Sequence, residues 1–201
     1  DNTGTFTSSL LTGFGATGGV AFFESGEDPV ENVVLNLGSG DDTVNIQSSH
    51  TGMEFAIDSG QGDDTFTVSD SSSTLDQING KLILDGGTLG NDSLLVSDSG
   101  DSDDNEDGQL NSGSISGFGA TEEISYSNME TLTVDLGAGI NDVAINGTSG
   151  VVKDGNNVIT HNGTVTTLNI NSGVDTISVA NVNGVSSQLF INGGNNGETL
   201  T

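Results

Sequence analysis

Hydrophobic and polar residues alternate along most of this chain, in short runs separated by glycine-rich turns. Val33, Leu35 and Leu37 alternate with other positions before one such turn, and Val44 and Ile46 alternate after it. A period of two places every second side chain on one face, which is the pattern of a half-buried β-strand. No segment longer than a few residues has the period of an amphipathic helix. The pattern therefore predicts an all-β protein.

The strand–turn–strand unit recurs along the chain. Residues 33–46 return as residues 55–68, 22 positions later, and four more divergent copies lie at 82–95, 132–145, 166–179 and 189–201. A unit with one apolar face cannot bury that face alone, so neighbouring units must stack. We therefore expect a parallel β-helix or β-roll solenoid built from rungs of about 22 residues. The alternative is a pair of tandem immunoglobulin-like β-sandwiches, which gives no reason for the strands of one module to resemble each other.

A longer period overlies the short one. The sequence Gly-Phe-Gly-Ala-Thr at residues 13–17 recurs at residues 117–121, a shift of 104. This predicts a repeat module 1 at residues 1–104 and a repeat module 2 at residues 105–201, continuous with the first and incomplete at its C-terminus. We expect a further module in the parent protein. Stacked modules also present unpaired strand edges, which predicts end-to-end homo-association.

Charge narrows the range of partners. The chain has 29 acidic and 2 basic residues among 201, a formal net charge of −27. Binding to nucleic acid or to an anionic membrane surface needs clustered Lys and Arg, so both partners are excluded. Apolar runs are too short for membrane insertion, and the absence of cysteine excludes disulfides and cysteine-based metal sites.

The repeated turn carries the candidate chemistry. Residues 38–46 read Gly-x-Gly-x-Asp followed by alternating apolar positions. Glycine allows a positive φ and turns carbonyl oxygens into the loop, while aspartate supplies the hard anionic oxygen that Ca²⁺ prefers. Because adjacent rungs stack these carboxylates, a divalent ion would relieve their repulsion. The simpler alternative is that Asp and Gly here only form good turns.

This nonapeptide resembles the calcium-binding repeats of RTX or haemolysin-type regions of bacterial secreted proteins, and the chain is also similar to the Gly-, Asp- and Thr-rich tandem arrays of giant bacterial surface adhesins. The resemblance implies Ca²⁺ as the cofactor. The turn residues that would bind it are Asp41, Asp42, Asp63, Asp64, Asp92, Asp175 and Glu198. Asn141 occupies the aspartate position of one divergent copy.

A second calcium candidate lies between the two modules. Asp103, Asn105 and Asp107 precede Gly108 in the D-x-[DN]-x-[DN]-G opening of a calcium loop. Position twelve of that loop is Ser114 rather than glutamate. The alternative interpretation is a solvated loop whose acidic side chains repel one another.

These features predict a non-enzymatic, extracellular or cell-surface structural and adhesive repeat module, stabilised by calcium and part of a long stalk, adhesin or filament. Its ligand would be a surface or a polysaccharide. Two alternatives stay open at this point. One is a calcium-dependent secretion or folding module of a secreted enzyme, and the other is a β-helical polysaccharide-active enzyme.

Overall fold

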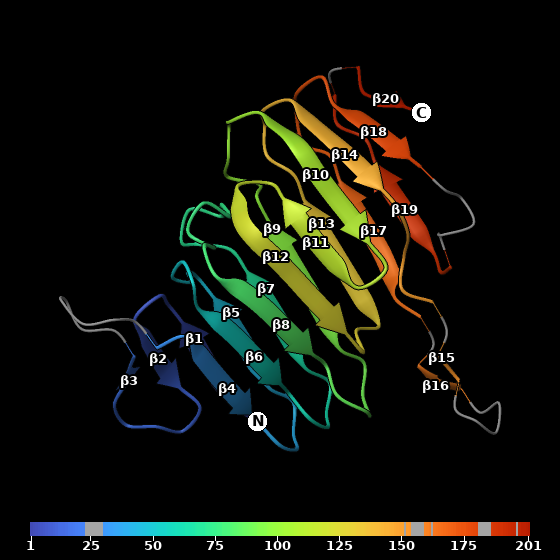
Figure 1. Ribbon diagram of the computed structural model, residues 1–201. Coiled ribbons are helices and arrows are strands. Elements are labelled where there is room, and N and C mark those ends of the chain that lie inside the picture. Colours follow the sequence, from blue (N-terminus) through green and yellow to red (C-terminus); the bar gives the residue numbers. More distant parts are fainter. Residues whose placement is uncertain (23–29, 151, 154–158, 162, 181–185, 196) are drawn as a thin grey trace.

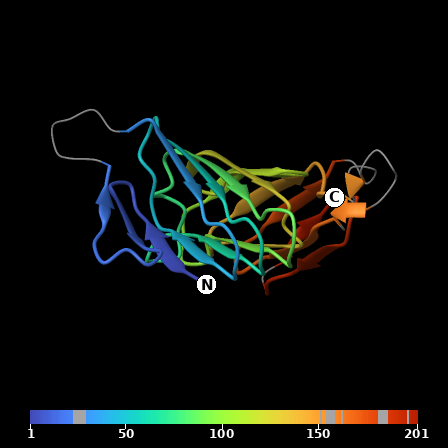
Figure 2. The ribbon, with the colours of Figure 1, turned by 90° about the horizontal axis from the view of Figure 1, so that it is seen from below.

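The computed structural model describes residues 1–22, 30–150, 152, 153, 159–161, 163–180, 186–195 and 197–201. Every regular element in this part of the chain is a β-strand, so the all-β prediction is confirmed. Among the same residues there is no helix long and apolar enough to cross a membrane. The strands lie side by side along the molecule (Figure 1), with the chain order reversed at the hairpins. A view from below shows that they form two layers (Figure 2).

Two nine-stranded sheets make up these layers. Sheet A contains, in spatial order, β19 (Leu189–Asn192), β17 (Val165–Asn169), β13 (Thr131–Asp135), β9 (Ser93–Ser97), β7 (Thr65–Val68), β5 (Thr43–Ile46), β1 (Thr3–Phe6), β2 (Leu10–Gly13) and β3 (Val20–Ala21). Sheet B contains β20 (Thr199–Leu200), β18 (Thr176–Val179), β14 (Asn141–Ile145), β10 (Asn105–Asn111), β11 (Ser114–Gly117), β12 (Ala120–Ser127), β8 (Lys81–Asp85), β6 (Glu54–Asp58) and β4 (Asn32–Asn36). A separate hairpin joins β15 (Val152–Lys153) and β16 (Ile159–His161).

Repeated units pair with one another in register. Apart from the hairpin strands, the chain passes alternately between the two sheets from β4 onwards, so that strands of successive units become neighbours. Val44 of β5 pairs with Phe66 of β7, and Phe66 pairs with Leu94 of β9, all in parallel. Equivalent positions of the sequence repeat therefore lie beside one another in the sheet.

The alternating apolar residues form one core between the sheets. Val44, Phe66 and Leu94 from sheet A are buried with Phe55 and Leu82 from sheet B. The two sheets meet directly where the ring of Phe6 stands edge-on to the ring of Phe55, with centroids 5.4 Å apart. Burial of these side chains is the main force that holds the layers together.

Antiparallel hairpins make both sheets mixed and mark the longer repeat. β1 pairs antiparallel with β2, and β10 pairs antiparallel with β11, at positions separated by the 104-residue shift. Phe14 and Phe118 follow these hairpins with positive φ angles of 51° and 55°. Each ring lies over a glycine: a Cβ on Gly4 would come within 1.8 Å of the Phe14 ring, and one on Gly108 within 2.3 Å of the Phe118 ring. The same local structure is thus built twice.

Both sheets continue through the predicted module boundary. Residue 104 precedes β10, and the strands on either side of the boundary are joined in parallel, β8 to β12 and β9 to β13. The core also continues across it, because Leu94 and Leu132 pair there and are both buried.

Candidate functional site

Glycine turns join the sheets between successive strands of the first half. The turn from β4 to β5 contains Gly38 and Gly40, with φ angles of 109° and 120°, and the next turn contains Gly60 and Gly62, at 99° and 132°. These backbone conformations favour glycine. The turns also stack closely, since a Cβ on Gly60 would lie 1.9 Å from the carbonyl oxygen of Gly38. Glycine is therefore needed here both for the turn and for its contact with the next turn.

A column of buried acids follows these turns. The Oδ1 atom of Asp64 accepts a hydrogen bond from the Asp42 amide at 2.7 Å, and Oδ1 of Asp92 accepts one from the Asp64 amide at 2.8 Å. Glu130 extends the column, since its Oε2 atom accepts from the Asp92 amide at 2.7 Å. Asp42, Asp64 and Asp92 are all buried. We call Asp42, Asp64, Asp92 and Glu130 the inner column.

Each acid of a rung thus uses one carboxylate oxygen to hold the backbone of the preceding rung. The second oxygen is treated differently. The Oδ2 atoms of Asp42 and Asp64, and that of Asp175 in the second half, are buried without a hydrogen-bond partner in the described part of the chain. A buried polar atom without a partner costs free energy, and a buried charge costs more. These three oxygens are the feature of the turns that most needs an explanation.

The pKa of Asp92 is shifted by its burial among other acids of the column. Burial raises the pKa of Asp92 to about 7, and the nearby charges of Asp64, Glu130 and Asp63 act in the same direction. The hydrogen bond from the Asp64 amide opposes them. A carboxyl group with this pKa is only partly ionised at neutral pH, so a cation bound at the column would have to compete with a proton.

The second half has its own column, on the other side of the molecule. Glycine turns in the first half lead from sheet B to sheet A, whereas those before β14, β18 and β20 lead from sheet A to sheet B. There Oδ1 of Asp175 accepts a hydrogen bond from the Asn141 amide at 2.7 Å. This bond is equivalent to the one that Asp64 accepts from the Asp42 amide. The six copies of the turn therefore form two columns.

Asn141 shows what fills the space beside a turn aspartate. Its Nδ2 atom donates to the carbonyl oxygen of Gly139 at 2.9 Å and to Oδ1 of Asp175 at 3.1 Å. A carbonyl oxygen and a carboxylate oxygen thus converge on one electropositive group. An aspartate at this place has no such donor to offer, so the same oxygens would repel its carboxylate unless a cation lay among them.

Asp41 and Asp63 belong to a different, exposed ladder. The Asp63 amide donates to Oδ1 of Asp41 at 3.0 Å, and the Asn91 amide donates to Oδ1 of Asp63 at 2.9 Å. Both carboxylates face solvent, where water can satisfy their remaining lone pairs. The structure therefore separates the adjacent acids of each Asp-Asp pair: Asp42 and Asp64 are buried, and Asp41 and Asp63 are not.

Glu198 takes the turn position of the last copy. It immediately precedes β20, and its Oε1 atom would lie 2.7 Å from a Cβ placed on Gly194. Its carboxylate therefore lies against a glycine turn, and its role as a calcium ligand stays a prediction. Asn196, which the sequence places at the third glycine position, lies outside the described residues.

The structure does not bring Asp103, Asn105 and Asp107 together as a calcium loop. Asn105 begins strand β10 and is buried, and its carboxamide donates to the carboxylates of Asp98 and Asp101 at 3.0 and 3.2 Å. Asp107 lies further along the same strand and is exposed. Asn105 is buried against Asp98 and Asp101, whereas Asp103 and Asp107 are exposed, so the structure gives no common site for the three side chains.

Sequence reasoning missed Asp98 and Asp101. Asp98 is buried, and burial raises its pKa to about 7, with further contributions from the charges of Asp101 and Asp76. Hydrogen bonds from the Leu75 amide and the Asn105 side chain oppose this shift. The dense acidic run after Ser97 was a visible signal, but it indicated a solvated loop rather than a buried pair.

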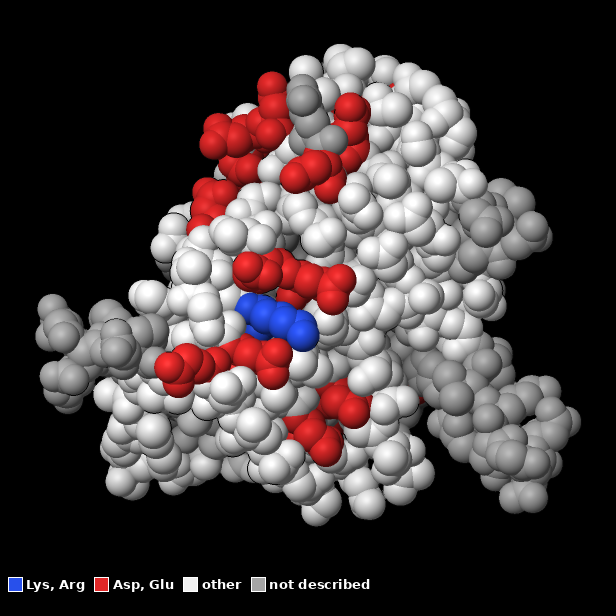
Figure 3. All heavy atoms as spheres, viewed as in Figure 1, with Lys and Arg blue, Asp and Glu red and all other residues white. Residues whose placement is uncertain are grey.

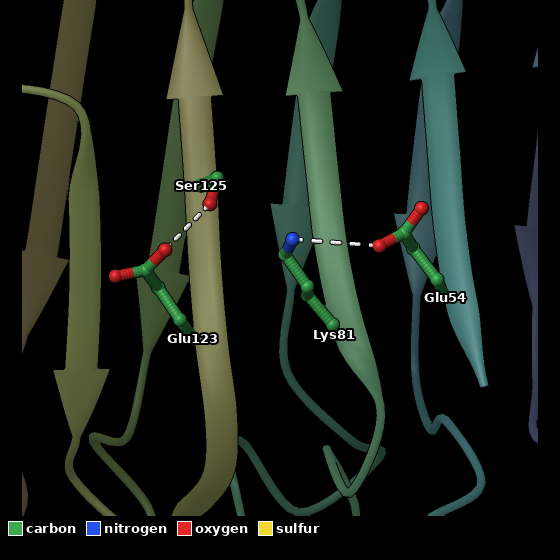
Figure 4. Close-up of polar contacts among 4 residues, drawn as sticks. All are labelled: Glu54, Lys81, Glu123 and Ser125. Atoms are coloured by element: carbon green, nitrogen blue, oxygen red, sulfur yellow. Dashed lines mark hydrogen bonds and ion pairs between the residues drawn. The ribbon is translucent and has the colours of Figure 1, made fainter. Parts of the chain in front are cut away.

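Acidic groups far outnumber basic ones on the face of the molecule in Figure 3. One basic patch on the face in Figure 3 is bordered by acidic groups. The Lys81 ammonium of β8 points towards Glu54 of β6, and its nitrogen lies 3.4 Å from a carboxylate oxygen of Glu54 (Figure 4). On β12, Glu123 accepts a hydrogen bond from the Ser125 hydroxyl. Both members of the ion pair are partly exposed, so the pair contributes little to stability.

Among the described residues, no group of three or more His, Cys, Asp or Glu side chains could hold a metal ion by itself. A cation at the turns would have to combine one carboxylate of each rung with main-chain carbonyl oxygens. The three buried Oδ2 atoms supply one carboxylate oxygen at each of these turns, and the bond from Asn141 to the Gly139 carbonyl oxygen shows that a main-chain oxygen can face the equivalent place. Ca²⁺ accepts carboxylate and carbonyl oxygens in flexible geometry, so the residues present fit calcium.

Comparison of the chain with protein-family models, with curated proteins and with solved structures finds no match. The candidate site therefore rests on its own residues and geometry.

Proposed function

We propose that this chain is a non-enzymatic, calcium-stabilised structural module of a long extracellular or cell-surface repeat protein, such as a stalk, adhesin or filament. The observation that carries this proposal is the repeated burial of a turn aspartate with one carboxylate oxygen left without a partner, at Asp42, Asp64 and Asp175. A feature that recurs in successive repeats points to a property of the whole array rather than to one active centre.

We further propose that the two sheets are the walls of a parallel β-solenoid. In support, strands of successive units pair in parallel within each sheet, and the intervening strands lie in the opposite sheet. The immunoglobulin-like alternative would have mainly antiparallel sheets. In a solenoid each rung contacts only its neighbours, so length grows without a change in cross-section. That property suits a spacer or a filament.

Calcium would act as the link between rungs. An ion bound by Asp42, Asp64 or Asp175 would neutralise a buried negative charge and satisfy its second oxygen. Carboxylates in adjacent rungs repel each other, and the effect is larger in a buried environment than in water. Sites built from few carboxylates and several carbonyl groups suit the weak, millimolar calcium affinities of extracellular modules. The extracellular location is proposed on this basis.

A calcium titration by calorimetry tests the proposal. The chain without added metal should bind Ca²⁺ at two or more sites with micromolar to millimolar affinity and bind Mg²⁺ more weakly, because Mg²⁺ gives up its waters reluctantly. Asp64→Asn should remove part of the heat. Asp63→Asn on the exposed ladder is the matched control and should change the heat much less. Equal heats for both variants, or no calcium heat in the wild type, would contradict the assignment.

A further inference from the structure

Among the described residues, the outermost strands of both sheets lack the charges and prolines that commonly protect sheet edges, and two of them, β3 and β20, are only two residues long. β3 and β4 form one pair of edges, and β19 and β20 form the other. Exposed strand edges normally carry charges or proline, which prevent pairing with another chain. None of these four strands contains a charged residue or proline, in a chain with 29 acidic residues. Their composition is that of strands that are normally covered.

The middle of the chain shows how such edges are covered. There β8 and β9 end module 1, and β12 and β13 begin the parallel pairing with module 2. Leu82 of β8 pairs with Ile124 of β12, and Leu94 of β9 pairs with Leu132 of β13. We call this contact the internal junction.

The free edges correspond to the two sides of that junction. β3 corresponds to β12. Val20 of β3 pairs with Leu11, and Ile124 of β12 pairs with Ile115, so both members of the second pair lie 104 residues after those of the first. By the same order of pairing, β4 corresponds to β13, β19 to β8 and β20 to β9. One end of the molecule therefore presents the β12–β13 side of a junction, and the other end presents the β8–β9 side.

Burial differs sharply between the junction and the free ends. Leu94 is 1% exposed, whereas its counterpart Leu200 is 65% exposed. Ile124 is fully buried, whereas its counterpart Val20 is 55% exposed. The apolar surface that the junction removes from water is therefore left open at both ends, and its burial would favour association.

We propose that the β19–β20 end of one copy of this chain binds the β3–β4 end of a second copy through the pairing of the internal junction. In that register Leu189 lies beside Val20, and Leu200 lies beside Val33 of the second copy. β19 and β3 both belong to sheet A, and β20 and β4 both belong to sheet B, so each sheet would continue from one copy into the next. The contact is head-to-tail and does not close, so it produces linear growth. This inference rests on the proposed structural function and names its partner.

Disulfide trapping tests the register. Thr131 and Ser93 are neighbours at the internal junction, and their counterparts at the free ends are Asn32 and Thr199. Adjacent strands lie about 4.8 Å apart, a distance that a disulfide can span. The chain has no cysteine of its own. Oxidation of an equimolar mixture of Asn32→Cys and Thr199→Cys at physiological salt should give mainly the mixed dimer, and the double variant should give a ladder of longer species.

Two controls make the result specific. Asn36→Cys mixed with Thr199→Cys is four residues out of register and should give little cross-linking. Val34→Pro should abolish association. The Glu31 carbonyl and the Leu37 amide form hydrogen bonds with β6. Backbone groups of a strand alternate in direction, so the Val34 amide faces the free edge, and proline would remove this donor. Mixed dimers no more abundant than those of either single variant, or a monomer at all concentrations in sedimentation, would overturn the proposal. Calcium-dependent melting would be unaffected by that outcome, so failure of this inference is distinguishable from failure of the proposed function.

Discussion

The turn that ends at Asp64 and the turn that ends at Asn141 occupy the same place in the repeat but differ in backbone and in side-chain chemistry. Gly60 and Gly62 have positive φ angles, whereas Gly137 and Gly139 do not. Both residues precede or begin a core strand, and both are hydrogen-bonded through their amides to an acid of the next rung. Both side chains have one buried oxygen without a hydrogen-bond partner, Oδ1 of Asn141 and Oδ2 of Asp64. Asn141 differs in having an Nδ2 group, which donates to surrounding oxygens. Asparagine thus places an electropositive amide beside its turn, and we propose that the aspartate turns obtain the equivalent group by binding a cation from solution.

The largest effect should come from converting the asparagine turn into an aspartate turn. Asn141→Asp would place a second carboxylate against Asp175 and the carbonyl oxygen of Gly139. In chelator the free energy of unfolding should fall by roughly 3–5 kcal/mol, the cost of a buried charge without compensation. Added Ca²⁺ should recover much of this loss. Urea unfolding in chelator and in calcium measures both terms, and an unchanged midpoint would show that the turn tolerates a carboxylate without a cation.

The reverse exchange should have a smaller effect of opposite sign. Asp64→Asn keeps the Oδ1 acceptor for the Asp42 amide and replaces the unpartnered oxygen by a donor. In chelator the variant should be more stable than the wild type by about 1–3 kcal/mol, the usual cost of an unsatisfied buried group. It should also gain less from calcium.

The matched control for this exchange is Asp63→Asn. Asp63 is adjacent to Asp64 but exposed, and it contributes only a minor part of the charge that raises the pKa of Asp92. The change should therefore alter stability and the response to calcium much less than Asp64→Asn does. Equal behaviour of the two variants would mean that burial of Asp64 has no consequence.

Proton binding should follow the same logic in the absence of metal. The pKa of Asp92 is raised to about 7 by burial and neighbouring acids, so the folded state binds a proton more tightly than the unfolded state. Its contribution to stability is complete below the unfolded pKa, near 4, and is lost as the pH rises through about 7. In chelator the melting temperature should therefore increase from pH 8 to pH 5, and Asp92→Asn should flatten that slope. In calcium the slope should weaken or reverse, because the ion binds the deprotonated acid.

The smallest effect concerns the exposed ion pair. Lys81→Met removes the partner of Glu54 on the outer face of sheet B, where both side chains are about 40% exposed. The expected loss is below about 1 kcal/mol and should shrink further in high salt. A loss as large as that expected at position 141 would show that surface charge, rather than the buried columns, controls stability.

The strands and their parallel neighbours could be predicted from the sequence, because the repeats show directly which positions are equivalent. The alternation around Val44 and Phe66 gave the strands, and the stacking argument gave their in-register neighbours. The two-sided placement of the glycine turns was not predicted. It depends on how many times the chain changes sheet within a module, which no local pattern encodes.

The candidate site was predicted in part. Buried and exposed acids could not be separated within the Asp41-Asp42 and Asp63-Asp64 pairs, because the turn geometry decides which carboxylate faces inward. The second candidate, at Asp103, Asn105 and Asp107, failed to converge because a local spacing motif takes no account of the strand pairing of β10 with β14. Asp98 was missed for a related reason: its burial depends on residues distant in sequence. One of these is Leu75, whose amide donates a hydrogen bond to the Asp98 carboxylate.

If the buried turn acids bind calcium as proposed, thermal unfolding of the wild-type chain at pH 7.5 should depend strongly on the ion. Each independent site adds about 2.7 kcal/mol at a hundredfold excess of ion over its dissociation constant, against a typical domain stability of roughly 5–15 kcal/mol. We expect a melting temperature that rises steeply with millimolar Ca²⁺, responds much less to Mg²⁺ and is lowest in chelator. The same melting temperature in calcium and in chelator would contradict the proposal, and the acids at Asp42, Asp64 and Asp175 would then serve only to form turns.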